Sequence, residues 1–279
     1  MITRDCLQQA LQLLTDAGCH SPRLDAELLL MHAWGISKTD LIIRMHDQPP
    51  TSVSAKFDTL LKRRLAREPV AYIIGEKEFW SRSFHVDSRV LVPRPETEHI
   101  IEAVLKLYTD RSSPYRFCDI GTGSGCIACT LAAEYPNANV VATDISADSL
   151  DVANANATRL GVENRITFRQ GDMFSALTQG IAPFDAIVSN PPYVSRNEMM
   201  GLEPELAYEP RHALTDERDG LHYLSILFNG CPDWLSDGGH LIVETGLCGL
   251  PPTPPQLHEI EAYKDLAGNS RGGIYRYQH

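Results

Sequence analysis

The sequence lacks a long apolar run. No stretch of its 279 residues approaches the roughly 18 apolar residues that a membrane-spanning helix needs, so we expect no membrane association. Residues 1–5 also lack the charged-then-apolar order of a signal peptide, and Asp5 argues against a transit peptide. The seven cysteines are scattered and odd in number. We therefore expect reduced thiols in a cytoplasmic protein.

The sequence also lacks a metal-site or nucleophile signature. Cys126 and Cys129 form a Cys-x-x-Cys pair, but no second pair stands at zinc spacing, and the ten histidines show no ligand spacing. A redox pair or half a zinc site is the alternative interpretation. Because small residues pack a helix onto a sheet, we interpret the two cysteines as buried small hydrophobic residues. We expect no bound metal, and no Ser, His and Asp set stands out.

Positive charge is scarce in most of the chain. Residues 1–80 hold ten Lys or Arg and ten Asp or Glu, whereas residues 81–279 hold fifteen against twenty-six. The whole net charge of −11 therefore lies in the second region. An acidic body is a poor partner for a phosphate backbone, so we expect no stable nucleic acid binding.

Apolar residues at helical spacing predict a small helical bundle over residues 1–75. Helices are expected at 3–17 and 24–34, the second ending at Gly35. Ser37 with Asp40 resembles a capping-box helix start.

The last long helix of this region, expected to open at Ser52 or Ser54, carries basic residues on its outer face. We interpret this face as solvated, with a docking patch as the alternative. Its basic residues are Lys62, Arg63, Arg64 and Arg67.

Residues 76–92 are rich in aromatic and β-branched side chains, which predicts a β-hairpin linker between two domains. Acidic residues after Pro95 suit the first turn of a helix that runs to Tyr108. Residues 93–279 would form the second domain.

From Arg116 onward, strand and helix patterns alternate, which predicts an α/β fold with a doubly wound, mostly parallel sheet. The C-terminal segments at 259–263 and 273–277 could close it as a hairpin, giving seven strands. Strands are expected at 117–120, 139–144, 165–169, 184–189 and 240–244, and helices at 126–135 and 147–159.

Asn190-Pro191-Pro192-Tyr193 follows an apolar strand. Neither proline can donate to a ladder, so the chain must turn after Asn190. An amide side chain then stands at the carboxyl end of a strand, where ligands bind in open α/β sheets. A plain strand-ending turn is the alternative for the prolines alone.

The segment Gly121-Thr122-Gly123-Ser124-Gly125 is a tight turn between a strand and a helix. Glycines let the backbone approach a ligand closely. Asp144 ends the next strand about 20 residues on, where nucleotide-binding folds hold a ribose diol. Asp119 is a second acid expected in the same crevice. Because a carboxylate would repel a pyrophosphate, this setting favours a cationic cofactor such as a sulfonium.

Asp172-Met173-Phe174 follows the third strand of the sheet. Asp172 could accept a hydrogen bond from an adenine amino group, with Met173 or Phe174 against the ring. The alternative, a turn aspartate with core neighbours, stays open on sequence alone.

With these residues assembled, the chain resembles the class I S-adenosylmethionine-dependent methyltransferases, and more closely the release factor glutamine methyltransferase family. The match extends over nearly the whole chain. The tetrad narrows the field to enzymes that methylate a planar NH2 group, and residues 93–98 with the helical region favour the release factor enzymes. The matching segments are 72–76, 91–98, 119–125, 190–193, 208–211, 213–214, 219–221 and 264–271.

The resemblance implies a Rossmann-like sheet and transfer of a methyl group from S-adenosylmethionine, which leaves S-adenosylhomocysteine. The acceptor would be the side-chain amide nitrogen (N5) of the glutamine in the Gly-Gly-Gln motif of class 1 peptide chain release factors, a change that modulates translation termination. The helical region would dock the release factor, and a monomer is expected.

The resemblance also implies roles for the site residues. Asn190 and Pro191 would carry catalysis by accepting the N–H groups of the glutamine amide. Cofactor contacts are expected from Gly121, Thr122, Gly123, Ser124, Gly125, Asp144, Asp172, Met173 and Asn190, and substrate contacts from Asn190, Pro191, Pro192 and Tyr193.

Two other functions stay open on the sequence. An N6-adenine nucleic acid methyltransferase would use the same tetrad on a flipped base, and a nucleotide-binding module would use it only as a turn. The acidic body disfavours the first, and the absence of a hydride-transfer constellation disfavours the second. The chain departs from the family at its Pro-rich residues 247–258, where a longer helix and strand are usual.

Overall fold

The computed structural model describes residues 1–178, 180–264, 268 and 270–279. The chain forms two compact units. The smaller unit contains residues 1–76 and 203–208, and the larger contains residues 77–202 and 209–279. The smaller unit therefore includes a short segment from far along the sequence.

The smaller unit is the expected helical bundle. Its core contains Leu14, Leu29, Leu30 and Leu41, each at most 2% exposed. Its helices are α1 (Thr3–Asp16), α2 (Pro22–Trp34), α3 (Lys38–Ile43), α4 (Thr51–Leu65), α5 (Val70–Ile74) and the 3-10 helix η5 (Pro204–Tyr208).

Local signals set several ends of these helices. Gly35 ends α2 in the left-handed conformation, and Ser37 and Asp40 form the expected capping box at the start of α3. Helix α4 begins at Thr51 with Pro50 at its N-cap, so the expected start at Ser52 or Ser54 is late by at least one residue.

The expected solvated basic face is wrong for Arg64. Its side chain is buried and donates to Asp25 Oδ2 at 2.7 Å and to Glu205 Oε1 at 2.8 Å. Arg67 donates from Nη2 to Glu205 Oε2 at 2.6 Å. Glu205 lies in η5, so these arginines hold the distant segment inside the helical unit. Lys62 is exposed, as expected.

The boundary between the units falls at Glu76, the first residue of a short hairpin. Strand β1 (Glu76–Phe79) pairs with β2 (Arg82–His85) through a two-residue turn. Trp80 and Ser81 both have positive φ, as a type I′ turn requires. The hairpin is thus present at 76–85, whereas residues 86–92 form no strand.

The larger unit is built on a seven-stranded sheet with the order β5-β4-β3-β6-β7-β9-β8 over the described residues. All pairs from β5 to β7 are parallel, and β9 runs antiparallel to both of its neighbours. This confirms the predicted fold class. The strands are β3 (Arg116–Ile120), β4 (Asn139–Asp144), β5 (Ile166–Gln170), β6 (Phe184–Ser189), β7 (Leu235–Glu244), β8 (Leu257–Lys264) and β9 (Ser270–Tyr277).

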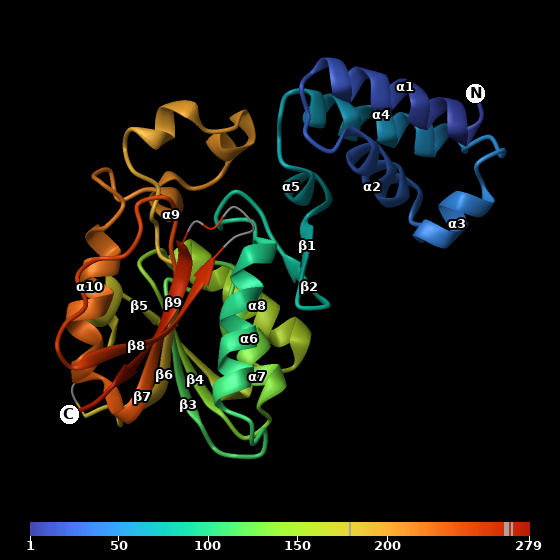
Figure 1. Ribbon diagram of the computed structural model, residues 1–279. Coiled ribbons are helices and arrows are strands. Elements are labelled where there is room, and N and C mark those ends of the chain that lie inside the picture. The colour runs from blue at the N-terminus through green and yellow to red at the C-terminus, as the bar shows by residue number, and fades with distance from the viewer. Residues whose placement is uncertain (179, 265–267, 269) are drawn as a thin grey trace. The chain divides into compact units, whose positions relative to one another are not determined.

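Helices cover both faces of this sheet. Figure 1 shows α6 (Glu98–Leu107), α7 (Cys126–Glu134) and α8 (Ala147–Leu160) on one side, and α10 (His222–Gly230) on the other. Side chains alternate along each strand. Phe117 faces the α6–α8 layer and Cys118 faces the α10 layer. The remaining elements are short: α9 (Arg211–Leu214), η1 (Pro95–Thr97), η2 (Glu163–Arg165), η3 (Met173–Ala176), η4 (Glu198–Gly201) and η6 (Cys231–Asp233).

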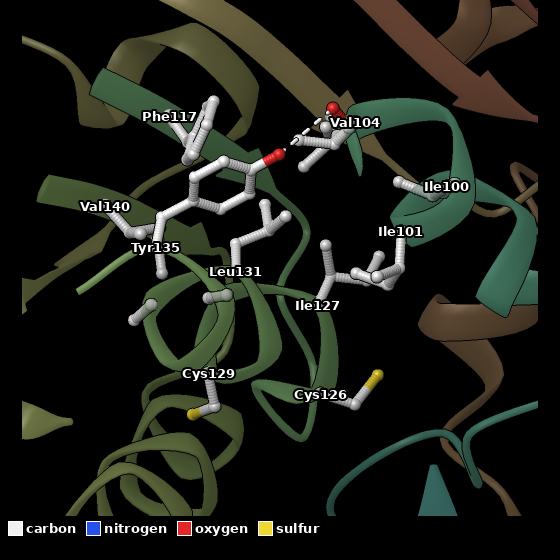
Figure 2. Close-up of a cluster of buried hydrophobic side chains, with 14 of the residues drawn as sticks. Ile100, Ile101, Val104, Phe117, Cys126, Ile127, Cys129, Leu131, Tyr135 and Val140 are labelled. Carbon is white, nitrogen blue, oxygen red and sulfur yellow. Dashed lines mark hydrogen bonds between the residues drawn. The ribbon is translucent and has the colours of Figure 1, made fainter. Parts of the chain in front are cut away.

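The Cys-x-x-Cys pair lies in α7, and both cysteines belong to the hydrophobic core against which this helix packs. Cys126 is 8% exposed and Cys129 is fully buried, and Figure 2 shows their sulfur atoms pointing in different directions. Burial raises the pKa of Cys126 to about 12. The interpretation as buried small hydrophobic residues is confirmed. Nearby, the hydroxyl of Tyr135 donates to the main-chain oxygen of Val104, as Figure 2 shows. It also lies 2.8 Å from the main-chain oxygen of Tyr108.

Two parts of the larger unit differ from expectation. Strand β7 begins at Leu235, five residues early, with a register shift opposite residues 184–186. Helices α9 and α10 had not been expected. Residues 247–256 contain turns and irregular chain. The segment 264–271 falls partly outside the described residues.

Candidate functional site

The candidate site lies at the carboxyl edge of the sheet, where β3 and β6 are neighbours. From β3 the chain moves to β4 and β5 on one side, and it later returns to β6 and β7 on the other. Such a switch point leaves a crevice for a ligand. The glycine turn leaves β3 there and Asn190 leaves β6, and Ser189 donates to the Ile120 oxygen at 2.7 Å between them.

The glycine turn folds back over the end of β4. The N–H groups of Gly121 and Thr122 both donate to the Thr143 oxygen, at 2.9 and 2.8 Å. Gly121, Gly123 and Gly125 all have positive φ, which disfavours a side chain at each position. A Cβ at Gly121 or Gly123 would meet open space, whereas one at Gly125 would stand 3.0 Å from Ala153 Cβ. The first two glycines thus open the crevice, and the third lets α7 approach α8.

Asp144, at the end of β4, is tied to this turn. Its Oδ2 accepts from Gly123 N and its Oδ1 from Ser146 N, both at 2.9 Å. The residue is 8% exposed, and burial raises the pKa of its carboxyl. The two backbone donors lower this pKa and offset only part of the effect of burial.

Asp119 lies beneath the turn and does not line the crevice, contrary to expectation. It is fully buried, and its Oδ2 accepts from Thr122 Oγ1 at 2.6 Å and from Ala128 N at 3.1 Å. Its Oδ1 has no hydrogen-bond partner within the described ranges. Burial raises the pKa of Asp119 to about 7. This acid therefore stabilises the turn from below.

A cavity opens above these residues, with about 750 Å³ of empty space when its mouth is included. The predicted residues that line it are Gly121, Gly123, Asp144, Asp172, Met173, Asn190 and Pro192.

The other predicted site residues lie beside the cavity. Thr122 and Ser124 are buried within the turn, and Ser124 O accepts from Asn156 Nδ2 at 2.9 Å. Pro191 is buried, and Tyr193 packs in the second core layer. These four residues do not line the cavity themselves; they form the turns that carry the residues lining it.

Asp172 and Met173 line the cavity, whereas Phe174 does not. Met173 has a φ of +49°, an uncommon conformation for a residue with a side chain. Phe174 instead stacks on Trp234 at a centroid distance of 6.5 Å and meets Gly230. Of the two residues proposed to lie against an adenine ring, only Met173 therefore lines the cavity.

Asn190 is held by a side chain that the sequence interpretation gave no role. Its Nδ2 donates to Thr97 Oγ1 at 2.9 Å, and Thr97 Oγ1 donates to Glu244 Oε2 at 2.7 Å. Glu244 Oε1 accepts from the hydroxyl of Tyr193 at 2.8 Å. Burial raises the pKa of Glu244, and the two hydroxyl donors offset part of that rise.

Five cavity residues outside the predicted set come from segments distant in sequence. Leu91 lies in the matching segment 91–98 and Ala213 in the matching segment 213–214, neither of which was assigned to the cofactor or the substrate. Val90 immediately precedes the segment 91–98. His212 precedes Ala213, and Tyr223 is the second residue of α10, a helix for which no sequence signal was identified.

No group of three or more His, Cys, Asp or Glu with the arrangement of a metal site occurs among the described residues. Over the same residues, no helix combines the length and apolarity needed to cross a bilayer.

Family profiles match both units. The PrmC N-terminal domain matches residues 5–75, and the methyltransferase small domain matches residues 103–217. Among solved structures, the delta-N METTL16 MTase domain superposes with a TM-score of 0.51 at 19% identity, covering 70% of this chain and 88% of that chain. At this identity the likeness concerns the fold alone. The fold and the matched profiles define a class I methyltransferase.

Curated relatives narrow the class. The release factor glutamine methyltransferase of Neisseria gonorrhoeae is 39% identical over 261 residues, covering 92% of this chain and 94% of the relative. The enzyme of the same name from Rhodopirellula baltica is 42% identical over 265 residues, covering 91% and 89%. That from Nitratidesulfovibrio vulgaris is 39% identical over 273 residues, covering 95% and 92%. The chain belongs to the release factor glutamine methyltransferase family.

Proposed function

We propose that this chain transfers a methyl group from S-adenosylmethionine to the side-chain amide nitrogen of the glutamine in the Gly-Gly-Gln motif of class 1 peptide chain release factors. Family membership supports this reaction. The observation that carries it is the amide of Asn190 at the cavity wall, with its Nδ2 already engaged by Thr97. The Oδ1 atom is thereby available to accept an N–H from a planar amide.

The cavity suits this cofactor. Gly121 and Gly123 leave room where a Cβ would otherwise project, and Asp144 presents a carboxylate to hydroxyl groups of a ribose. We assign Asp172 to the adenine amino group and Met173 to the face of the ring. Thr122, Ser124 and Gly125 hold the turn. An acidic, cation-poor wall favours a sulfonium over a pyrophosphate.

The acceptor nitrogen needs positioning because its lone pair is delocalised. Asn190 Oδ1 and the Pro191 carbonyl each accept one N–H of the glutamine amide, which fixes the NH2 group and makes it more electron-rich. Pro192 keeps the turn rigid, and Tyr193, held at its hydroxyl by Glu244, bounds the amide site. Alignment and electrostatics supply the rate enhancement.

The bound cofactor supplies an electrophilic methyl group: the nitrogen lone pair forms the N–C bond, the S–C bond breaks with its electrons going to sulfur, and S-adenosylhomocysteine remains. The methylated amide nitrogen then releases a proton to solvent. No strong general base is needed, and we assign none.

We further propose that residues 1–75 dock the release factor, that 76–92 link the domains, and that 93–279 carry the transfer. We also propose a cytoplasmic monomer without stable nucleic acid binding, and the acidic larger region supports the last of these points. The buried ion pairs of Arg64 leave the rest of the helical surface for the partner.

Labelled S-adenosylmethionine, incubated with the protein and either a release factor or DNA, tests the reaction. We expect label on the Gly-Gly-Gln glutamine and none on DNA. Label on DNA adenine, with none on the factor, would support the N6-adenine alternative instead.

Asn190→Ala tests the site. We expect at least about a 10³-fold loss of kcat because the positioned acceptor disappears, with cofactor Kd within about tenfold of the parent. Asn154→Ala, which removes an exposed amide on α8, is the matched control and should retain full activity. Retained turnover in Asn190→Ala would refute the role of this amide.

A further inference from the structure

Two buried side chains outside the predicted site residues meet behind the substrate tetrad. Thr97 ends η1, in the segment Pro-Arg-Pro-Glu-Thr-Glu, and Glu244 ends β7, 147 residues later. Both are buried, at 2% and 5% exposure. Their side chains join Asn190 to Tyr193 through hydrogen bonds of 2.9, 2.7 and 2.8 Å.

We propose that Thr97 and Glu244 are positioning residues that determine which end of the Asn190 amide faces the substrate. This inference rests on the proposed function, because it needs Asn190 Oδ1 as the acceptor for the glutamine N–H. Thr97 and Glu244 lie outside the tetrad and determine which end of the Asn190 amide donates a hydrogen bond and which end accepts one.

The polarity follows from counting hydrogens. A threonine hydroxyl carries one hydrogen and can accept through its lone pairs. Glu244 Oε2 takes that hydrogen, so Thr97 can only accept from Asn190. An Asn amide can satisfy an acceptor only with its NH2 end. The Nδ2 end is therefore turned toward Thr97, and the Oδ1 end is turned away from it. A flipped amide would place the acceptor atom Asn190 Oδ1 against Thr97 Oγ1, which can also only accept.

The same carboxyl group fixes the other end of the tetrad. Its second oxygen accepts from the Tyr193 hydroxyl, and the Tyr193 ring lies against Gly246, where a Cβ would come within 2.6 Å of Cδ2. One side chain therefore constrains both Asn190 and Tyr193, which flank the two prolines.

A purely structural role explains the carboxyl poorly. Glu244 forms no ion pair with any residue in the described part of the chain, so its burial is compensated by neutral donors alone. Burying such a group disfavours folding relative to an apolar residue of similar volume. Its specific contribution is that, as an acceptor, it imposes a direction on every hydroxyl that reaches it.

Thr97→Val tests the proposal because it keeps the shape and removes the hydroxyl. We expect kcat on the release factor to fall about 10- to 100-fold, as the NH2 of Asn190 loses its acceptor and the amide can rotate. Cofactor Kd, measured by calorimetry, should stay within about twofold. Thr97→Ser keeps the hydroxyl and should restore kcat to within about threefold of the parent.

Thr130→Val is the matched control. Thr130 is fully buried in α7, and its hydroxyl has no hydrogen-bond partner among the described residues. The same atoms change there, and kcat should not. Equal losses in Thr97→Val and Thr130→Val would overturn the proposal, as would parental kcat in Thr97→Val.

Glu244→Gln provides a second variant if Thr97→Val does not fold. It adds a donor where two acceptors are needed, so one of the two hydroxyls loses its acceptor, and we expect at least about a fivefold loss of kcat. Parental kcat in a folded Glu244→Gln would also overturn the proposal. A parent protein that binds cofactor but does not methylate the factor would instead refute the proposed function.

Discussion

Acidic side chains with little exposure have different hydrogen-bond partners in the helical unit and around the cavity. In the helical unit, Asp25 and Glu205 contact the guanidinium of Arg64, and Glu205 also contacts Arg67. Burial alone would raise the pKa of Glu205, but the arginine hydrogen bonds outweigh it and hold this pKa below its ordinary value.

Around the cavity, three buried acids accept hydrogen bonds from neutral donors. Asp119, Asp144 and Glu244 accept from hydroxyl and main-chain N–H groups, and burial raises the pKa of each. A guanidinium at these positions would stabilise the carboxylates but would place fixed positive charge next to a cationic cofactor. The helical unit thus uses ion pairs for cohesion, whereas the region around the cavity buries acids at a cost in stability and has no Lys or Arg in its lining among the described residues.

Removing the shared cation should have the largest effect. Arg64→Ala leaves Asp25 buried without its partner, and we expect the helical unit to lose about 3–5 kcal/mol. Native-state hydrogen exchange, followed in peptides of α1, α2 and α4, measures this loss by unit. Arg23→Ala, at an exposed ion pair on α2, is the control and should change stability by less than about 1 kcal/mol. Similar losses of stability in Arg64→Ala and Arg23→Ala would contradict the role of the Arg64 ion pairs in the cohesion of the helical unit.

Neutralising an acid near the cavity should change the pH dependence of stability. The pKa of Asp119 rises from an ordinary 3.8 to about 7, so the folded state holds a proton that the unfolded state releases between these values. Parental stability therefore falls as pH rises through this window, by on the order of 4 kcal/mol from this residue.

Asp119→Asn cannot titrate and should lack this fall. The measurement is the difference in unfolding free energy between variant and parent at pH 5, 6, 7 and 8, by urea denaturation. We expect the difference to move in favour of the variant up to about pH 7 and then level off. A difference independent of pH would show that Asp119 is ionised throughout.

The same chemical change in the helical unit should have the opposite sign and the smallest size. Asp25→Asn removes the charge that faces Arg64, and we expect a loss of about 1–3 kcal/mol at neutral pH. Hydrogen exchange of α2 and α4 measures it. A gain in stability here, matching that of Asp119→Asn, would remove the distinction between the two regions.

Local features of the fold were predictable from the sequence. The capping box of Ser37 and Asp40 and the stop at Gly35 each depend on neighbouring residues. The glycine turn and the strand before Asn190 followed from short patterns. Strand β7 was placed five residues late because Gly238 and Gly239 resemble a turn, whereas they lie beside a register shift in the strand.

Contacts between distant segments were not predictable. Arg64 was interpreted as solvated because Glu205 stands 141 residues away. Thr97 stands in the matching segment 91–98, whereas Glu244 ends the strand expected at 240–244, and no periodicity links them. The cavity contributions of His212 and Tyr223 depend on how residues 209–230 return to the sheet, which single-sequence patterns do not encode.

The distribution of the cysteines has a practical consequence. Five are buried, whereas Cys6 in the helical unit and Cys248 in the larger unit are partly exposed. Each unit thus offers one thiol for a maleimide dye or a nitroxide. A donor and acceptor attached there would form a native spectroscopic ruler, able to follow the two units as a release factor arrives and leaves.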